Sequence, residues 1–255
     1  MKSPISVIAR YTFLEAVRNR LFGLTVVGLI CLLGVTEFAG DLAITETSVL
    51  KAAFVGSGMR MFAVITVSLF VITSMVREFG DKGFELILAL PIPRHAYYTG
   101  KFAGFMLLAL TITGASGLLL LIYAQAGAVL VWTCSLGCEL ALIVAASLLC
   151  LFSFSNVTVS FVAVLAFYLL SRSIGTIQLL GASPILESDT LSHHFMVGLA
   201  NAIAWVLPDL DRFTRTDWVV YGGGWHDLLP VLAQTVIYSA LLVAAGLFDL
   251  YRKDL

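Results

Sequence analysis

Charged residues are scarce in this chain of 255 residues. Asp, Glu, Lys and Arg make up 12% of it, against about 25% in an ordinary soluble domain, whereas hydrophobic residues make up 60%. Because 15 basic side chains nearly balance 16 acidic ones, for a formal net charge of -1, no global basic surface is available to bind nucleic acid. The composition therefore excludes a soluble enzyme and a nucleic-acid partner.

Motifs for ATP hydrolysis and for hydrolase chemistry are also missing. The pair Gly100-Lys101 is not a phosphate-binding loop, since His95 stands where its first glycine is required and Phe102 where Ser or Thr is required. The chain contains no HExxH and no GxSxG, and no second carboxylate accompanies Glu139 at membrane depth. We therefore expect a non-catalytic chain with no cofactor of its own.

The cysteines form no CxxC pair and have no histidine at the spacing of a zinc site. All of them lie inside apolar runs: Cys31, Cys134, Cys138 and Cys150. We interpret them as small buried hydrophobic residues and expect no bound metal.

Long runs without charge are the strongest signal in the sequence. The 70 residues from Phe102 to Ser171 contain one charged residue, Glu139. As a single helix this run would be about 105 Å long, more than three times the bilayer core of about 30 Å, so it must turn back twice. Glycine or polar residues cluster at 125–127 and 153–156, where we place the turns. The predicted fold is all-α and membrane-embedded, with six spans at 21–39, 53–76, 102–124, 129–152, 157–180 and 228–248.

The distribution of Lys and Arg predicts the orientation, because basic loops stay in the cytoplasm. Ten basic residues lie before the first span, between the second and third, or after the sixth, and five lie on the other side: Lys51, Arg60, Arg172, Arg212 and Arg215. This bias places both termini in the cytoplasm, as an even number of spans requires. Arg60 interrupts the second span, and we expect it to reach the headgroups from near a helix end.

Residues 3–20, before the first span, have the pattern of an amphipathic helix. Ser3 is a candidate N-cap and Pro4 suits the first helical position. Ile5, Ile8, Thr12, Phe13 and Val17 form an apolar stripe, with Arg10, Glu15 and Arg18 on other faces. We expect a helix in the cytoplasmic interface, and the alternative is a solvated tail.

The stretch 77–101 is too long and too apolar for a simple connection between neighbouring helices, which needs about 2–8 residues. Its middle, residues 83–90, can form two helical turns that expose Phe84, Ile87 and Leu88, and Pro91 then helps to end the helix. Such a helix either fills a groove on a partner or packs against its own bundle.

Two further features are candidates for a site. Glu139, inside a predicted span, faces a polar conduit or a partner subunit, or is protonated and hydrogen-bonded within the bundle.

The segment 181–227 contains an apolar stretch, Phe195 to Leu207, that is too short to cross the membrane and is expected to be re-entrant or interfacial. His193 and His194, just before it, point to different faces of a helix and lack a third ligand, so we do not expect a metal site there.

This layout resembles the membrane subunit of ABC-2 type (type V exporter-fold) ABC transporters, in particular the branch that includes the permease of nitrous oxide reductase maturation. The resemblance covers most of the chain and is most specific within 77–101. The family's acidic start, Gly-x-Glu, apolar triplet, proline, arginine and closing Gly-Lys correspond here to Glu78, Gly83, Glu85, Leu86-Ile87-Leu88, Pro91, Arg94 and Gly100-Lys101. Phe84 departs from the family, in which Thr is common at this position.

Three other segments carry the resemblance. Residues 3–20 look like the family's elbow helix, and Leu207-Pro208-Asp209-Leu210 resembles its extracytoplasmic Leu-Pro motif. The last residues, Tyr251 to Leu255, resemble its basic C-terminal ending.

The resemblance implies that the short cytosolic helix is a coupling helix, which inserts into a groove on a separate ATPase subunit. The expected contact residues are Glu78, Lys82, Gly83, Phe84, Glu85, Ile87, Leu88, Pro91 and Arg94. Two copies of that subunit would bind ATP and Mg, and the permease would pair with a second copy of itself or a related chain in the bacterial inner membrane. Because the family mostly exports, an exporter is the expected function.

A stand-alone membrane protein, either a secondary carrier or an assembly scaffold, is the alternative. Glu139 would then serve as a proton site or another polar site. This alternative leaves the apolar helix within 77–101 without a role.

Overall fold

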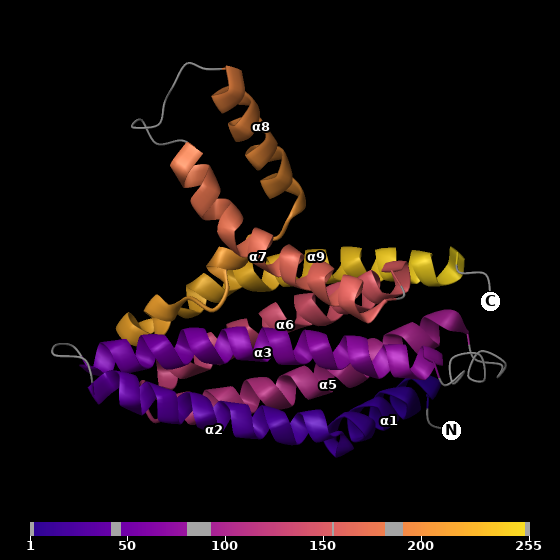
Figure 1. The fold of residues 1–255 in the computed structure, drawn as a ribbon, viewed down its shortest axis with the longest axis horizontal. Coiled ribbons are helices and arrows are strands. Elements are labelled where there is room, and N and C mark those ends of the chain that lie inside the picture. The colour runs from indigo at the N-terminus through magenta and orange to yellow at the C-terminus, as the bar shows by residue number, and fades with distance from the viewer. Residues whose placement is uncertain (1–2, 42–46, 81–92, 155, 182–190, 253–255) are drawn as a thin grey trace.

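A computed structural model describes residues 3–41, 47–80, 93–154, 156–181 and 191–252 of the protein. Every regular element in these ranges is helical, which confirms the all-α prediction. Six helices are long and apolar enough to cross a membrane, as predicted: α2 (Arg20–Asp41), α3 (Thr47–Gly80), α5 (Arg94–Leu120), α6 (Ala126–Phe154), α7 (Val157–Gly181) and α9 (Trp225–Arg252). They form an elongated bundle, and the protein is of the multi-pass membrane type (Figure 1).

Both described termini, the end of α3 and the start of α5 gather at one end of the bundle (Figure 1). We call this the 81–92 end, because residues 81–92 connect α3 to α5 there. The turn between α5 and α6 lies at the opposite end, at 121–125 rather than at the predicted 125–127, since α6 already begins at Ala126.

Helix α3 is longer than predicted because its charged residues have partners inside the protein. It begins at Thr47 rather than at residue 53 and has 34 residues. Lys51 pairs with Glu37 of α2, and the Arg60 guanidinium donates a hydrogen bond of 2.9 Å to the carbonyl of Thr214. Arg60 lies in the interior of the continuous helix α3, so the expectation that it stands near a helix end is wrong, whereas its reach to the headgroups stays a prediction.

Helix α6 is the centre of the bundle and packs against α3, α5, α7 and α9. In its most apolar window 78% of the residues are buried, against 17% in α2 and 11% in α9. Large side chains such as Trp132, Leu136 and Leu140 fill the space around it, and the small Ala145 and Ala146 admit close neighbours. The peripheral helices α2 and α9 instead leave apolar side chains exposed, as lipid contact requires.

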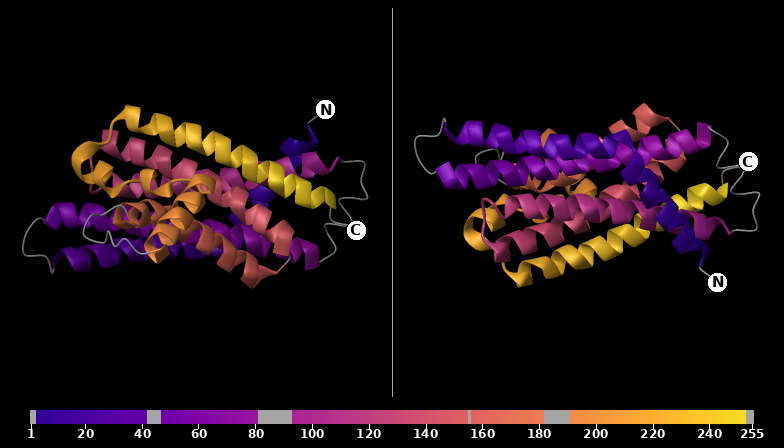
Figure 2. Two further views of the ribbon diagram at one scale, coloured as in Figure 1. Left: turned by 90° about the horizontal axis from the view of Figure 1, so that it is seen from above. Right: turned by 90° about the horizontal axis from the view of Figure 1, so that it is seen from below.

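Helix α1 (Pro4–Arg18) crosses obliquely over the 81–92 end and packs on α5 (Figure 2). Its approach is close, since a Cβ added at Gly104 would lie 2.6 Å from Cβ of Thr12 and 2.8 Å from the carbonyl oxygen of Ala9. The buried face therefore consists of small residues, Ala9, Thr12 and Ala16. Of the predicted apolar stripe, Ile8 and Phe13 pack against the core, whereas Ile5 and Val17 stay exposed. The location of this helix in the membrane interface stays a prediction.

A helical hairpin projects from the side of the bundle. Helix α8 (Leu191–Val206) lies beside α7, and α8 extends away from the bundle together with the C-terminal part of α7, whose first part packs on α6 and α3 (Figure 1). The chain then returns to the bundle through the short 3-10 helix η1 (Leu210–Arg212) and the π-helical turn η2 (Trp218–Gly222). The predicted short helix before Pro208 is thus present, and His193 and His194 lie in its first turn.

Candidate functional site

Most of the residues predicted to contact an ATPase subunit lie outside the described residues. These are Lys82, Gly83, Phe84, Glu85, Ile87, Leu88 and Pro91. Glu78 and Arg94, which flank the segment, are described, and both make contacts within the protein. The site is therefore built from the two flanks of 81–92.

Glu78, in the last turn of α3, joins this helix to the start of α5. Its carboxylate forms an ion pair with the Lys101 ammonium and accepts a hydrogen bond of 2.8 Å from the Tyr97 hydroxyl. The side chains of Lys101 and Glu78 are only 7% and 13% exposed. Water screens such a pair poorly, so its loss costs more than the loss of a surface salt bridge. The pair holds the two flanks of 81–92 together.

Arg94, the first residue of α5, binds the end of α9. Its guanidinium donates hydrogen bonds of 3.1 Å to the carbonyl of Leu250 and 3.3 Å to that of Tyr251. The last carbonyls of a helix have no partner within the helix, and a cation there also complements the helix dipole. Arg94 thus connects the second flank of 81–92 to the C-terminal helix.

A third connection ties α1 to α3. The Glu15 carboxylate accepts hydrogen bonds from the Arg77 guanidinium at 2.7 Å and from the Ser74 hydroxyl at 3.2 Å. Arg77 is 55% exposed and Glu15 39%, so this ion pair is weaker than the Glu78–Lys101 pair. We call the three connections together the flank clamps: Glu78 with Lys101 and Tyr97, Arg94 with the end of α9, and Glu15 with Arg77 and Ser74.

Glu139 lies in the middle of α6 and is fully buried. Its carboxylate lies 3.4 Å from the Arg172 guanidinium of α7 and accepts a hydrogen bond from the Thr214 hydroxyl. The backbone N–H of Thr214 donates to the Ser135 hydroxyl at 2.9 Å, one turn earlier on α6. Of the three surroundings considered for Glu139, the structure places it among hydrogen-bonding groups inside the bundle.

The groups around Glu139 anchor the chain segment 210–214. Arg172 also donates hydrogen bonds to the carbonyls of Leu210 at 3.0 Å and Phe213 at 3.3 Å, and Arg60 holds the carbonyl of Thr214. Thr214 has a φ of 46°, a left-handed conformation that is unfavourable for a β-branched residue. Hydrogen bonds to its N–H, its carbonyl and its hydroxyl compensate for that strain. We call this group the Glu139 centre.

Sequence reasoning found Glu139 but missed its partners. The charge distribution assigns Arg172 to the outer side, and Arg60 interrupts a predicted span; in the structure both arginines donate hydrogen bonds to the segment 210–214. The position of the two arginines in the sequence indicates such contacts, because an arginine inside a long apolar run needs an acidic or carbonyl partner.

The charged residues of α1 have different surroundings. Glu15 belongs to the flank clamps, whereas Arg10 and Arg18 are exposed on α1.

No family model matches this chain, and no curated protein matches it either.

Proposed function

We propose that this protein is the non-catalytic permease subunit of an ATP-binding-cassette transporter, an exporter driven by ATP hydrolysis on a separate subunit. The observation that carries the proposal is the set of flank clamps around 81–92. The sequence of that segment is similar to a coupling helix, and its flanks are joined to α1, α3, α5 and α9. A displacement of the segment by a partner would therefore move several helices at once.

The contacts link these helices to one another, so that a displacement of 81–92 would pass from one helix to the next. Glu78 and Lys101 hold the end of α3 to α5, so that the two flanks shift as one body. Arg94 extends this connection to α9, and Arg77 extends it to α1. Packed helices respond to a local displacement by rigid-body shifts, because their tightly packed interfaces resist continuous deformation.

The composition of 81–92 provides a surface for the partner. Phe84, Ile87 and Leu88 supply apolar anchors, and Lys82 and Glu85 supply charges at the rim. In the proposed complex two ATPase subunits bind ATP and Mg, and a second permease chain completes the membrane part in the bacterial inner membrane. Both termini and 81–92 then face the cytoplasm.

The surroundings of Glu139 favour this proposal over a stand-alone proton-coupled carrier. A carrier's proton site must exchange with water on both sides in turn, whereas Glu139 is fully buried and bonded to Arg172 and Thr214. These contacts indicate that it positions 210–214.

The test is co-purification from native membranes in mild detergent, followed by mass spectrometry and an ATPase assay. We expect a stoichiometric ATP-binding partner with vanadate-sensitive activity, and we expect Phe84→Asp to abolish its association while membrane insertion is retained. Phe154→Asp is the matched control, because Phe154 is a 52% exposed phenylalanine at the same end of the bundle. An eluate without ATPase, or equal loss in both variants, contradicts the proposal.

A further inference from the structure

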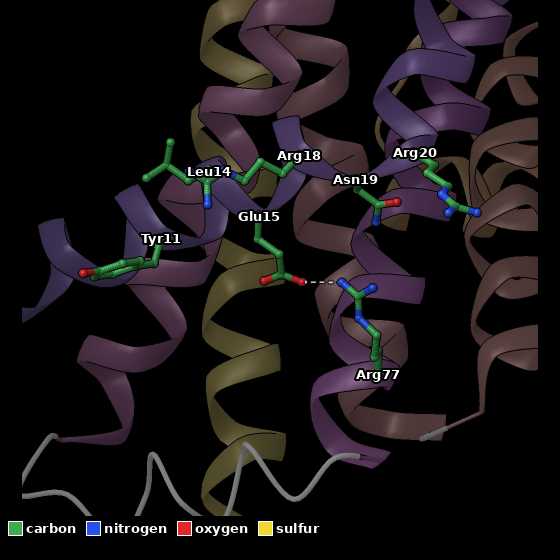
Figure 3. A pocket seen from close by; sticks show the side chains of 7 residues that line it. All are labelled: Tyr11, Leu14, Glu15, Arg18, Asn19, Arg20 and Arg77. Carbon is green, nitrogen blue, oxygen red and sulfur yellow. Dashed lines mark hydrogen bonds and ion pairs between the residues drawn. The ribbon is translucent and has the colours of Figure 1, made fainter.

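A basic crevice opens where α1 meets the start of α2 and the end of α3. Its volume is about 720 Å³. Its lining residues are Tyr11, Leu14, Glu15, Arg18, Asn19, Arg20 and Arg77. Figure 3 shows Glu15 and Arg77 paired in it, with the Arg18 side chain lying toward Leu14 and with Arg20 beyond Asn19, at the start of α2.

The crevice carries excess positive charge. It contains three arginines and one carboxylate, and that carboxylate, Glu15, already pairs with Arg77. Within the described part of the chain, Arg18 and Arg20 have no ion-pair partner, and both are exposed. The Asn19 side-chain oxygen accepts a bond from the N–H of Leu21, which leaves its amide group to donate. Guanidinium and amide donors together suit a phosphate group.

The position of the crevice is that of the lipid headgroups. Arg20 is the first residue of α2, whose 22 residues span about 33 Å, close to the thickness of the bilayer core. Arg77 lies in the last turn of α3, the next spanning helix. The arginines therefore lie at the boundary between hydrocarbon and water.

The rim of the crevice is apolar and continues along α1. Tyr11 is 69% exposed and Leu14 37% exposed. Both also line a smaller neighbouring crevice of about 300 Å³, together with Ser6, Val7 and Arg10. A basic crevice with an apolar border matches a molecule that has an anionic head and hydrocarbon tails.

We propose that this crevice binds the phosphate headgroup of an anionic phospholipid. The Asn19 amide donates to the phosphate, the Arg18 and Arg20 guanidinium groups attract its negative charge from the two sides of Asn19, and the acyl chains lie along Leu14 and Tyr11. The bound lipid fixes α1 at the membrane surface, next to the flank clamps. This assignment does not depend on the transporter proposal, since it rests on the charge and depth of the crevice alone.

Native mass spectrometry of the purified full chain in neutral detergent tests the site, with phosphatidylglycerol as the probe and phosphatidylcholine as the neutral comparison. An arginine near an anionic lipid contributes about fivefold to binding. We expect about fivefold weaker phosphatidylglycerol binding for Arg18→Gln and for Arg20→Gln, and more than tenfold for the double variant. The charge-retaining Arg20→Lys should keep most of the affinity, which separates binding from folding.

Two further variants sharpen the test. Arg252→Gln removes an exposed arginine at the same end of the bundle but outside the crevice, and we expect less than a twofold change. Glu15→Gln frees Arg77 from its ion pair and should strengthen phosphatidylglycerol binding.

Three results overturn the assignment. Equal losses in Arg252→Gln and the crevice variants would mean general surface attraction, and equal binding of the two lipids would mean no headgroup recognition. Binding of soluble glycerophosphoglycerol as tight as that of the lipid would mean a site for free anions.

Discussion

Glu78 and Glu139 each form an ion pair inside the bundle, but they join very different parts of the chain. Glu78 binds Tyr97 and Lys101, which lie just beyond the 81–92 segment in sequence. Glu139 binds Arg172 and Thr214 and helps to hold a segment that begins after α8. Glu78 remains 13% exposed at the end of a helix, whereas Glu139 is fully buried in the middle of one. The same chemistry thus clamps two neighbouring flanks at one site and anchors a distant segment at the other.

The two centres also differ in what their bonds fix. The Glu78 carboxylate is bound by Lys101 and Tyr97, so it joins the ends of two helices. Glu139 is fully buried, and its partner Arg172, which is 19% exposed, also binds the carbonyls of Leu210 and Phe213. Several bonds therefore fix the segment 210–214, which is not helical along its whole length.

The largest effect is expected from Glu139→Ala. The change leaves the Arg172 guanidinium without its carboxylate in the bundle, and removing one partner of a buried pair costs about 3–5 kcal/mol. Chemical unfolding in mild detergent, followed by circular dichroism, measures the loss. Glu139→Gln retains an acceptor for the Thr214 hydroxyl and should lose less; a loss below about 1 kcal/mol in the alanine variant would refute the anchoring role.

Lys101→Ala tests the connection between Glu78 and Lys101, one of the three flank clamps at the 81–92 end of the bundle. It removes the cationic partner of Glu78, and we expect a loss of about 1–3 kcal/mol, because Tyr97 and some water still reach the carboxylate. Amide hydrogen exchange should accelerate at 76–80 and 94–101 and stay unchanged around Glu139.

The matched control for Lys101→Ala is Lys51→Ala. It breaks a lysine–glutamate pair at the opposite end, whose Glu37 is 53% exposed, and its effect on stability should be smaller. Accelerated exchange around Glu139 in Lys101→Ala would show that the two centres are not independent.

Gly104→Ala tests whether close packing of α1 supports the flank clamps. The added Cβ would lie 2.8 Å from the backbone oxygen of Ala9, so α1 must shift, at a cost of about 1–3 kcal/mol. Gly114→Ala, in the same helix with nothing within 4 Å of its Cβ, should be neutral or slightly stabilising. Equal stability of the two variants would contradict the packing described for α1.

The smallest effect concerns Tyr123, in the turn between α5 and α6. Partial burial and the hydrogen bond of 2.6 Å to the Glu37 carboxylate raise the pKa of Tyr123 to about 12. Because the folded state favours the neutral phenol, this contribution to stability is complete below the unfolded pKa of about 10 and is lost as the pH rises through 12. The phenolate absorbance of the wild type minus that of Tyr123→Phe gives its titration. In Glu37→Gln the midpoint should fall; an unchanged midpoint would exclude the carboxylate as a cause.

The helices were predictable because their signal is local. Charge-free runs of bilayer length determine where spans lie, and all six long apolar helices are present, with ends displaced by up to eight residues, as at the start of α5. The buried face of α1 was predicted only in part, because it depends on Gly100 and Gly104 of another helix. The small residues of α1 are buried because glycines of α5 let the backbone of α1 approach closely. The sequence of α1 alone does not show where those glycines lie.

The sequence by itself determined the class of the protein, because a chain with 12% charged residues and long apolar runs is stable in a bilayer only as helices that satisfy their own backbone hydrogen bonds. It also singled out Glu139 as a charge inside a span that needs a partner, and the resemblance to a permease family drew attention to Glu78 and Arg94. Only the tertiary structure decided what those charges bind, since the packing of the helices brings Lys101 to Glu78, the end of α9 to Arg94, and Arg172 and Thr214 to Glu139. A charge buried in a bundle must have a partner, but which partner it has depends on which helices meet.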